Sequence, residues 1–160
     1  MKRCRPHLGF AEKGEEAINL YVSLIPNSRV ISVNRYGEGG PMPAGSLSWA
    51  MFELDGREYS AFDGGPTFKF AEGFSLFVSC ETQQEIDRLW NAFSDSGDEG
   101  QCGWIKDRYG LSWQIVPTAM MEMMSNPSGG DVGAMMQAML QMKKLDVEGL
   151  RAAYKGVPAS

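Results

Sequence analysis

The stretch that decides the fold is "ETQQEIDRLWNAFSDSG", residues 81–97. Its large apolar side chains recur with the spacing i, i+3, i+4 and i+7; they are Ile86, Leu89, Trp90 and Phe93. This spacing places them on one face of a helix. The stretch opens with acidic residues, which suit the positive end of a helix, and it closes in Asp-Ser-Gly, which is typical of a turn. It therefore predicts an amphipathic helix that packs on a core.

An earlier stretch, "EKGEEAINLYVSLIPNS" at residues 12–28, repeats the pattern. The matching positions each lie 69 residues before their counterparts; they are Ala17, Leu20, Tyr21 and Leu24. Amphipathic helices resemble one another, so the equal spacing alone leaves chance open. A duplication is the better interpretation only if the elements around both helices follow the same order.

Runs with strand character flank both helices in the same order. Around the first helix they are "PHLGF", "RVISVNRY", "SLSWAMFEL" and "REYSAF"; around the second they are "FSLFVSC", "QCGWIKD" and "LSWQIV". Turn signals such as "GEGGPMPAG", "LDGRE" and "RYGLS" separate them. One strand of the second half is poorly marked and is expected to be very short. The fold class is therefore α+β, with two βαβββ modules at about 1–68 and 69–118, which together fill residues 1–118.

Residues 119–160 form a tail of a different kind, rich in methionine. It is predicted to be helical, with breaks at Asn126-Pro127 and near Leu145-Asp146. Eight of the eleven methionines lie between Met120 and Met142. Their thioethers could bind a soft copper ion. A deformable apolar surface that packs on the sheet or on another subunit is the favoured interpretation.

Composition argues against several partners. The net charge is −5 and no dense Lys/Arg cluster occurs, which is not the pattern of a nucleic-acid-binding protein. No apolar run approaches the ~20 residues that span a bilayer. The three cysteines, Cys4, Cys80 and Cys102, are scattered and form no CxxC motif, so free thiols in a reducing cytoplasm are expected. Glu81 beside Cys80 opposes a reactive thiolate at that position.

The order of these motifs resembles a known family. The stretches that carry the resemblance are "EEAINLYVSLIPNSRV", "FDGGPTFKF", "FSLFVSCETQQEIDRLW", "GQCGWIKDRYGLSWQIVP" and, in the tail, "VGAMMQAMLQMKKLDVEGLRAAYKG". They resemble the PhnB-like family, often described as a 3-demethylubiquinone-9 3-methyltransferase domain, of the vicinal oxygen chelate (glyoxalase/bleomycin-resistance) superfamily. The resemblance implies curved sheets from the two modules that form a cup, and a homodimer.

Counting from motifs transfers the superfamily's ligand positions to this chain. The first-strand position lies thirteen residues before Leu20-Tyr21, at His7. The last-strand positions lie four residues after the turn glycines, at Ser60 and Gln114. The first strand of the second module gives Ser75, with Phe74 as its one-residue alternative. The resemblance thus implies a ligand-binding pocket lined by His7, Ser60, Ser75 and Gln114.

These residues are a poor metal site, so no cofactor is expected, although a divalent metal remains an alternative. Such an ion needs three or four good donors, and one imidazole, one amide and two hydroxyls fall short of that. Asp63 and Glu53 would enter the site only if the strand register shifted by one residue.

The methyltransferase name has no support in the residues. The glycine-rich "YGEGGPMPAG" is followed by a predicted strand, so it offers no helix N-terminus to hold the S-adenosylmethionine of a methyltransferase. The sequence therefore predicts a small-molecule-binding protein or enzyme of the vicinal oxygen chelate type, and it does not specify the substrate. A metal-dependent lyase, isomerase or dioxygenase of the same fold, or a non-catalytic dimeric module, are the alternatives.

Overall fold

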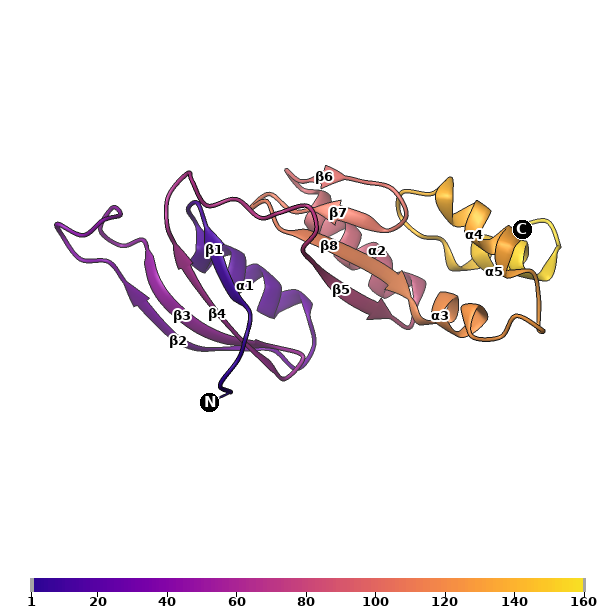
Figure 1. Ribbon diagram of the computed structural model, residues 1–160, viewed down its shortest axis with the longest axis horizontal. Coiled ribbons are helices and arrows are strands. Elements are labelled where there is room, and N and C mark those ends of the chain that lie inside the picture. Colours follow the sequence, from indigo (N-terminus) through magenta and orange to yellow (C-terminus); the bar gives the residue numbers. More distant parts are fainter. Residues whose placement is uncertain (1, 160) are drawn as a thin grey trace. The chain divides into compact units, whose positions relative to one another are not determined.

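Each half of the chain folds as one helix on one four-stranded sheet. A computed structural model describes residues 2–159 and divides the chain into two compact units, Met1–Ala71 and Glu72–Ser160. The second unit also contains the three helices of the tail (Figure 1). The predicted breaks near Asn126-Pro127 and Leu145-Asp146 are confirmed, because the tail helices end and begin around them.

The first unit runs strand, helix and three strands. Its elements are β1 (His7–Phe10), α1 (Gly14–Leu24), β2 (Arg29–Arg35), β3 (Leu47–Leu54) and β4 (Arg57–Asp63). The sheet order is β1-β4-β3-β2, in which β1 pairs with β4 in parallel and the other pairs are antiparallel.

The second unit repeats this topology strand for strand. Its elements are β5 (Ser75–Cys80), α2 (Gln83–Ser94), β6 (Asp98–Glu99), β7 (Trp104–Lys106) and β8 (Ser112–Pro117). The sheet order is β5-β8-β7-β6, again with the first and last strands in parallel. The prediction of two βαβββ modules is confirmed. The strand that the sequence marked poorly is β6, which has two residues.

The two helices bury their apolar faces to different degrees. All four predicted residues of α2 are buried, and Trp113 of β8 stacks on Phe93 at 4.5 Å between ring centroids. On α1 the buried residues are Gly14, Ala17, Ile18 and Tyr21. Leu20 and Leu24 are only partly buried, so the predicted stripe on this helix was turned from the observed one.

A buried carboxylate fixes the start of α1. Asp63, at the end of β4, accepts hydrogen bonds from the backbone N–H groups of Gly14 at 2.8 Å and Leu47 at 2.9 Å. A Cβ atom on Gly14 would lie 2.8 Å from the Asp63 Oδ1 atom, so only glycine allows this approach. Gly14 is therefore buried because the Asp63 carboxylate binds its N–H at the first turn of α1, not because it is apolar.

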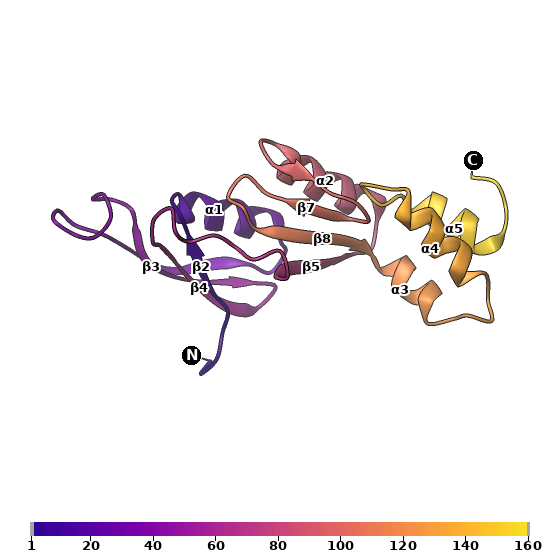
Figure 2. The same cartoon turned by 45° about the horizontal axis from the view of Figure 1, so that its top comes forward.

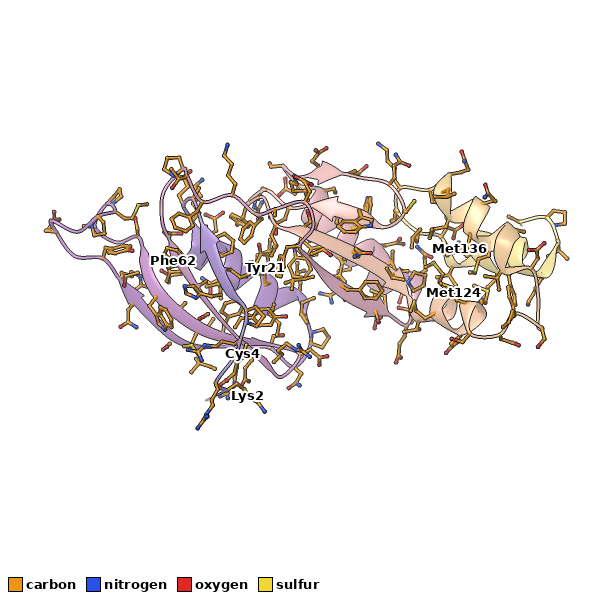
Figure 3. The ribbon with its side chains drawn as sticks, viewed as in Figure 1. Lys2, Cys4, Tyr21, Phe62, Met124 and Met136 are labelled. Atoms are coloured by element: carbon orange, nitrogen blue, oxygen red, sulfur yellow. The ribbon has the colours of Figure 1, made fainter. Side chains whose placement is uncertain are left out.

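The tail consists of α3 (Thr118–Met124), α4 (Val132–Leu140) and α5 (Val147–Lys155), grouped beyond the end of β8 (Figure 2). Its core is a cluster of six buried residues: Val116, Met120, Met135, Leu145, Leu150 and Tyr154. Four more methionines pack against this cluster, among them Met136, which Figure 3 shows on α4. Six methionines of the tail thus serve as packing groups within the second unit, whereas Met121 and Met124 are exposed.

Gln83, at the start of α2, holds the tail by both ends of its amide. Its Nε2 donates to the Leu145 carbonyl oxygen at 3.1 Å, and its Oε1 accepts from the Val147 N–H at 2.9 Å. Backbone N–H groups of Cys102 and Gly103 donate to the carbonyls of Met142 and Lys143, each at 2.8 Å. The tail is therefore bonded to the second module through its backbone as well as packed on it.

We expect Gln83→Ala to loosen the tail. The change leaves the Val147 N–H without its partner and should cost about 1–3 kcal/mol of stability. Hydrogen exchange at the Val147 amide should accelerate. The neighbouring Gln84 is exposed, so Gln84→Ala is the matched control and should leave that exchange unchanged. Equal exchange in the two variants would contradict the role assigned to Gln83.

Among residues 2–159, no helix is both long enough and apolar enough to cross a lipid bilayer.

Candidate functional site

Each sheet has one face covered by its helix and a second face that carries the candidate residues. In the first unit, Leu8, Phe10 and Ala61 are buried on the side of α1. Side chains alternate along a strand, so their neighbours point to the opposite side. We call that side the first candidate face; it comprises His7, Trp49, Met51, Ser60 and Phe62.

The first candidate face brings His7 and Ser60 together. The two residues are direct partners in the parallel β1–β4 ladder, and the His7 Nδ1 and Ser60 Oγ atoms form a 2.7 Å hydrogen bond. The imidazole lies between two aromatic rings. Its centroid is 5.0 Å from the Phe62 ring, nearly parallel at 5°, and 4.9 Å from the Trp49 ring, tilted by 32°. Figure 3 shows Phe62 on β4.

The second candidate face comprises Ser75, Phe77, Trp104 and Gln114, opposite the buried Trp113 side. Gln114 lies between Phe77 and Trp104 in the strand register. Its Nε2 donates to the Ser75 Oγ atom at 3.0 Å. Phe74 lies just before β5, so Ser75, and not its one-residue alternative, is the residue that meets Gln114. Val116, two residues further along β8, is buried against the tail, which therefore borders this face.

The four residues that the resemblance implied thus form two hydrogen-bonded pairs, one in each unit. Each pair joins the first strand of a module to its last strand. This arrangement follows from the parallel pairing of those strands, which sets their side chains at neighbouring positions on one face. Whether these residues bind a ligand stays a prediction.

Two charged groups near the candidate faces form ion pairs. Glu53 shares the side of Met51 by alternation, and its carboxylate binds the Arg29 guanidinium, with Nε to Oε2 at 2.8 Å. This contact lowers the pKa of Glu53. Lys106, beside Ser112 in the register, forms an ion pair with Glu72. The centre of the second face therefore presents neutral polar atoms and aromatic rings, whereas the positive charge of Arg5 lies near His7 on the first face.

Partial burial of the imidazole lowers the pKa of His7 below 6.5, and the nearby positive charge of Arg5 adds to this effect. We expect the ring to be neutral at pH 7. Since His7 is the single histidine of the chain, its titration by ¹H–¹⁵N NMR reports one group without overlap.

The lowered pKa makes stability depend on pH. Between the folded pKa and 6.5 the unfolded chain binds more protons than the folded one, so the His7 contribution is complete above 6.5 and is lost as pH falls through the folded pKa. His7→Gln should remove this dependence. A measured folded pKa at or above that of the urea-unfolded chain would contradict the expectation.

The donor set does not fit a catalytic metal ion. The first face offers one imidazole and one hydroxyl, and the second face offers one hydroxyl and one amide. Within residues 2–159 there is no group of three or more His, Cys, Asp or Glu side chains that could hold a metal ion. Asp63, which a register shift would have made a ligand, is instead buried in the cap of α1. The expectation that no cofactor binds stays a prediction.

The cysteines do not form a reactive centre in the described structure. Cys80 is buried, and burial together with the negative charge of Glu85 raises its pKa to about 11. A thiol with this pKa is inert near neutral pH. Cys4 is exposed and Cys102 is partly exposed, and neither forms a disulfide.

A separate surface cavity of about 390 Å³ lies in the first unit. It is lined by the N-terminal arm and the β3–β4 turn, with Lys2, Cys4, Arg57 and Glu58 among its residues (Figure 3). None of the four candidate residues lines it. Its position gives no support for a function of those residues.

Sequence reasoning missed the aromatic residues of the two faces. Trp49, Phe62 and Phe77 lie on the same faces as the polar pairs, and Trp49 and Phe77 are 39% and 50% exposed. The signal was present in part, because alternation along "SLSWAMFEL" places Trp49 opposite the buried Ala50. The sequence of one strand does not predict its neighbouring strands. It therefore could not predict which ring contacts which polar group.

The glycine-rich residues 36–46 connect two strands. They join β2 to β3 as a hairpin loop, closed by the backbone bond from the Tyr36 N–H to the Ser46 carbonyl at 2.8 Å. Figures 1 and 2 show this loop projecting from its sheet. A nucleotide-type cofactor loop would open a helix. The predicted strand after this stretch is confirmed, because β3 begins at Leu47.

Comparison with known proteins identifies relatives of the whole two-module region. The family model described as 3-demethylubiquinone-9 3-methyltransferase matches residues 2–116. A PhnB protein from Bacillus cereus with the same description is 34% identical over 72% of this chain and 99% of its own, with a TM-score of 0.68. Protein PA1353 from Pseudomonas aeruginosa shares the fold at 20% identity, over 73% of this chain and 98% of its own, with a TM-score of 0.59.

A glyoxalase/bleomycin resistance protein from Albidiferax ferrireducens T118 aligns at 9% identity over 71% of this chain and 95% of its own, with a TM-score of 0.46. No curated protein matches the chain. Residues 117–160 lie outside the family match, so the resemblance of the tail stays a prediction. Nothing beyond the family's name supports methyl transfer. The chain belongs to the 3-demethylubiquinone-9 3-methyltransferase (PhnB-like) family.

Proposed function

We propose that this protein binds a small molecule on its two candidate faces, with His7 and Ser60 as polar anchors in the first unit and Ser75 and Gln114 in the second. The observation that carries the proposal is that each unit presents one hydrogen-bonded polar pair among large aromatic side chains. Ligand sites commonly combine an apolar lining with a few placed polar groups.

The anchors are oriented before any ligand arrives. The hydrogen bond to Ser60 and the two flanking rings fix the plane of the His7 imidazole. The bond to Ser75 fixes the Gln114 amide in the same way. Groups that are already ordered lose little conformational entropy on binding, which favours a specific site over a general apolar surface.

The test is a small-molecule screen by thermal shift, followed by titration of each hit into the His7→Ala and Gln114→Ala variants. We expect these variants to bind the hits about tenfold or more weakly, because a lost anchoring hydrogen bond costs on the order of 1.4 kcal/mol. Gln141→Ala removes an exposed glutamine of the tail and is the matched control. Hits that bind a variant carrying both His7→Ala and Gln114→Ala as tightly as the wild type would refute the proposed anchors.

We expect the purified protein to contain far less than one metal ion per chain. The measurement is elemental mass spectrometry on untagged protein prepared without chelators. The reason is the donor set, which lacks carboxylates and has one imidazole. About one ion per chain, lost in His7→Ala, would instead favour a metal-dependent lyase, isomerase or dioxygenase of this fold.

We propose further that the protein acts in the cytoplasm as a homodimer and that it binds neither nucleic acid nor membranes. The free cysteines support the cytoplasmic location. The net charge of −5 argues against binding to nucleic acid. Exposed apolar residues of the tail, Met121, Met124 and Leu140, offer apolar surface for self-association. Light scattering coupled to size-exclusion chromatography tests the dimer, and a monomer at micromolar concentration would exclude it.

A further inference from the structure

We infer that the ligand class is uncharged, flat aromatic molecules that carry a hydroxyl or carbonyl oxygen. The inference rests on the proposed function, since it names the kind of molecule that the two candidate faces select. Three features lead to it: exposed aromatic rings on both faces, the absence of a net charge at the centre of the second face, and the direction of the hydrogen bond there.

The first candidate face carries a row of aromatic rings in contact. Trp49, His7 and Phe62 follow one another at 4.9 and 5.0 Å between centroids, and Phe68 meets the edge of Phe62 at 4.9 Å. Both ends of this row are exposed, Trp49 at 39% and Phe68 at 41%. Aromatic rings attract further rings through offset-stacked and edge contacts. A flat aromatic ligand would extend the row at Trp49.

The second candidate face places its rings on either side of an amide. Phe77 and Trp104 are the strand partners of Gln114 on β5 and β7. Phe77 is 50% exposed, which is unusual for a phenylalanine in a sheet. A flat molecule that contacts Phe77 or Trp104 therefore has the Gln114 amide beside it. The face supplies ring contacts and a polar contact together.

Charge on the second face is already neutralised, because Lys106, beside Ser112 in the register, is paired with Glu72. A charged ligand would lose its hydration without gaining an opposite charge at the centre of that face. An uncharged ligand avoids this cost.

The polar pair of the second face can serve an oxygen atom. The Ser75 hydroxyl accepts its hydrogen bond from Gln114 Nε2, so its own proton can be donated elsewhere. A ligand hydroxyl or carbonyl oxygen would accept that proton. The Oε1 atom of Gln114 can accept a proton from a ligand hydroxyl. This set of donors and acceptors matches a phenol or an aromatic ketone.

Three probes separate the ring, the charge and the site. They are 2-naphthol, its saturated analogue decahydro-2-naphthol, and the anion 2-naphthoate, each titrated into the ¹⁵N-labelled protein. We expect 2-naphthol to bind about fivefold or more tightly than either of the others, the increment of one aromatic contact. The indole N–H signals of Trp49 and Trp104 should shift. The indole N–H groups of Trp90 and Trp113 donate to Glu99 and Asp107, so their signals are internal controls.

Variants complete the test. Trp49→Leu removes the exposed ring and keeps an apolar side chain, so it should weaken 2-naphthol about fivefold and leave decahydro-2-naphthol unchanged. Leu140→Ala, on the exposed surface of α4, is the control for loss of an apolar group. If decahydro-2-naphthol or 2-naphthoate binds as well as 2-naphthol and shifts the same signals, the ligand class is wrong and the proposed site stands. If no probe shifts the His7, Trp49, Trp104 or Gln114 signals, both fail.

Discussion

Replacing Trp113 with alanine should lower the free energy of unfolding by about 3–5 kcal/mol, the range for removing a buried aromatic side chain. Trp113 is 1% exposed, and its ring stacks on Phe93 of α2. Its Nε1 atom donates to the buried Asp107 carboxylate at 2.9 Å. The variant thus opens a cavity between α2 and the sheet and removes a donor from Asp107. Urea unfolding followed by circular dichroism measures the loss.

Trp49→Ala is the matched control. Trp49 lies in the first sheet, on the side that α1 does not cover, and is 39% exposed. It should cost about 1 kcal/mol or less, the usual range for a surface change. A similar loss in both variants would contradict the assignment of Trp113 to the helix-covered side and Trp49 to the candidate face.

Replacing Asp63 with alanine is the second large change, with an expected loss of about 2–6 kcal/mol. Asp63 is 3% exposed and accepts from two buried backbone N–H groups, at Gly14 and Leu47. Each donor left unpaired costs about 1–3 kcal/mol. The first turn of α1 should therefore fray, which hydrogen exchange at the Gly14 amide would detect.

Glu53→Ala is the control for loss of a carboxylate. Glu53 pairs with Arg29, whose side chain is 69% exposed, so the ion pair should contribute about 1 kcal/mol or less. Both acidic residues were sequence-based alternatives for a ligand site. If Asp63→Ala abolished ligand binding while stability stayed unchanged, its structural role would be wrong.

The sequence predicted the modules because two independent patterns agreed. The helical spacing around Trp90 and the order of strands around it both recur in the first half, and a shared order restricts the topologies open to the chain. A very short strand was expected in the second half, but the residues of β6 could not be named, since a strand needs several residues for alternation to be visible. The buried stripe of α1 was misplaced because Gly14 carries no apolar side chain and Asp63 explains its burial.

The sequence indicated which side of each sheet the counted residues occupy better than it indicated their surroundings, although their role as a site stays a prediction. Counting from Gly56 to Ser60 and from Gly110 to Gln114 gave residues that lie on the side of their own sheet away from its helix, because a tight turn fixes the register of the strands that it joins. The ring contacts of His7 were not predictable in the same way. They depend on how β1, β4 and β3 lie side by side, and no local pattern in "PHLGF" encodes that neighbour relation.

The bonds between the tail and the second module impose an order on folding during synthesis. The ribosome releases the chain from its N-terminus, so every strand of the first unit has emerged once Asp63 is out. The core of the second unit includes Leu150 and Tyr154, which emerge after every strand of both units. Gln83 and the Cys102 N–H lack the carbonyl groups to which they donate until Leu145 and Met142 have emerged, and Val116 lacks part of its packing until Tyr154 follows. A nascent chain of this protein therefore has every strand of its first unit available for folding while the second unit still waits for α5.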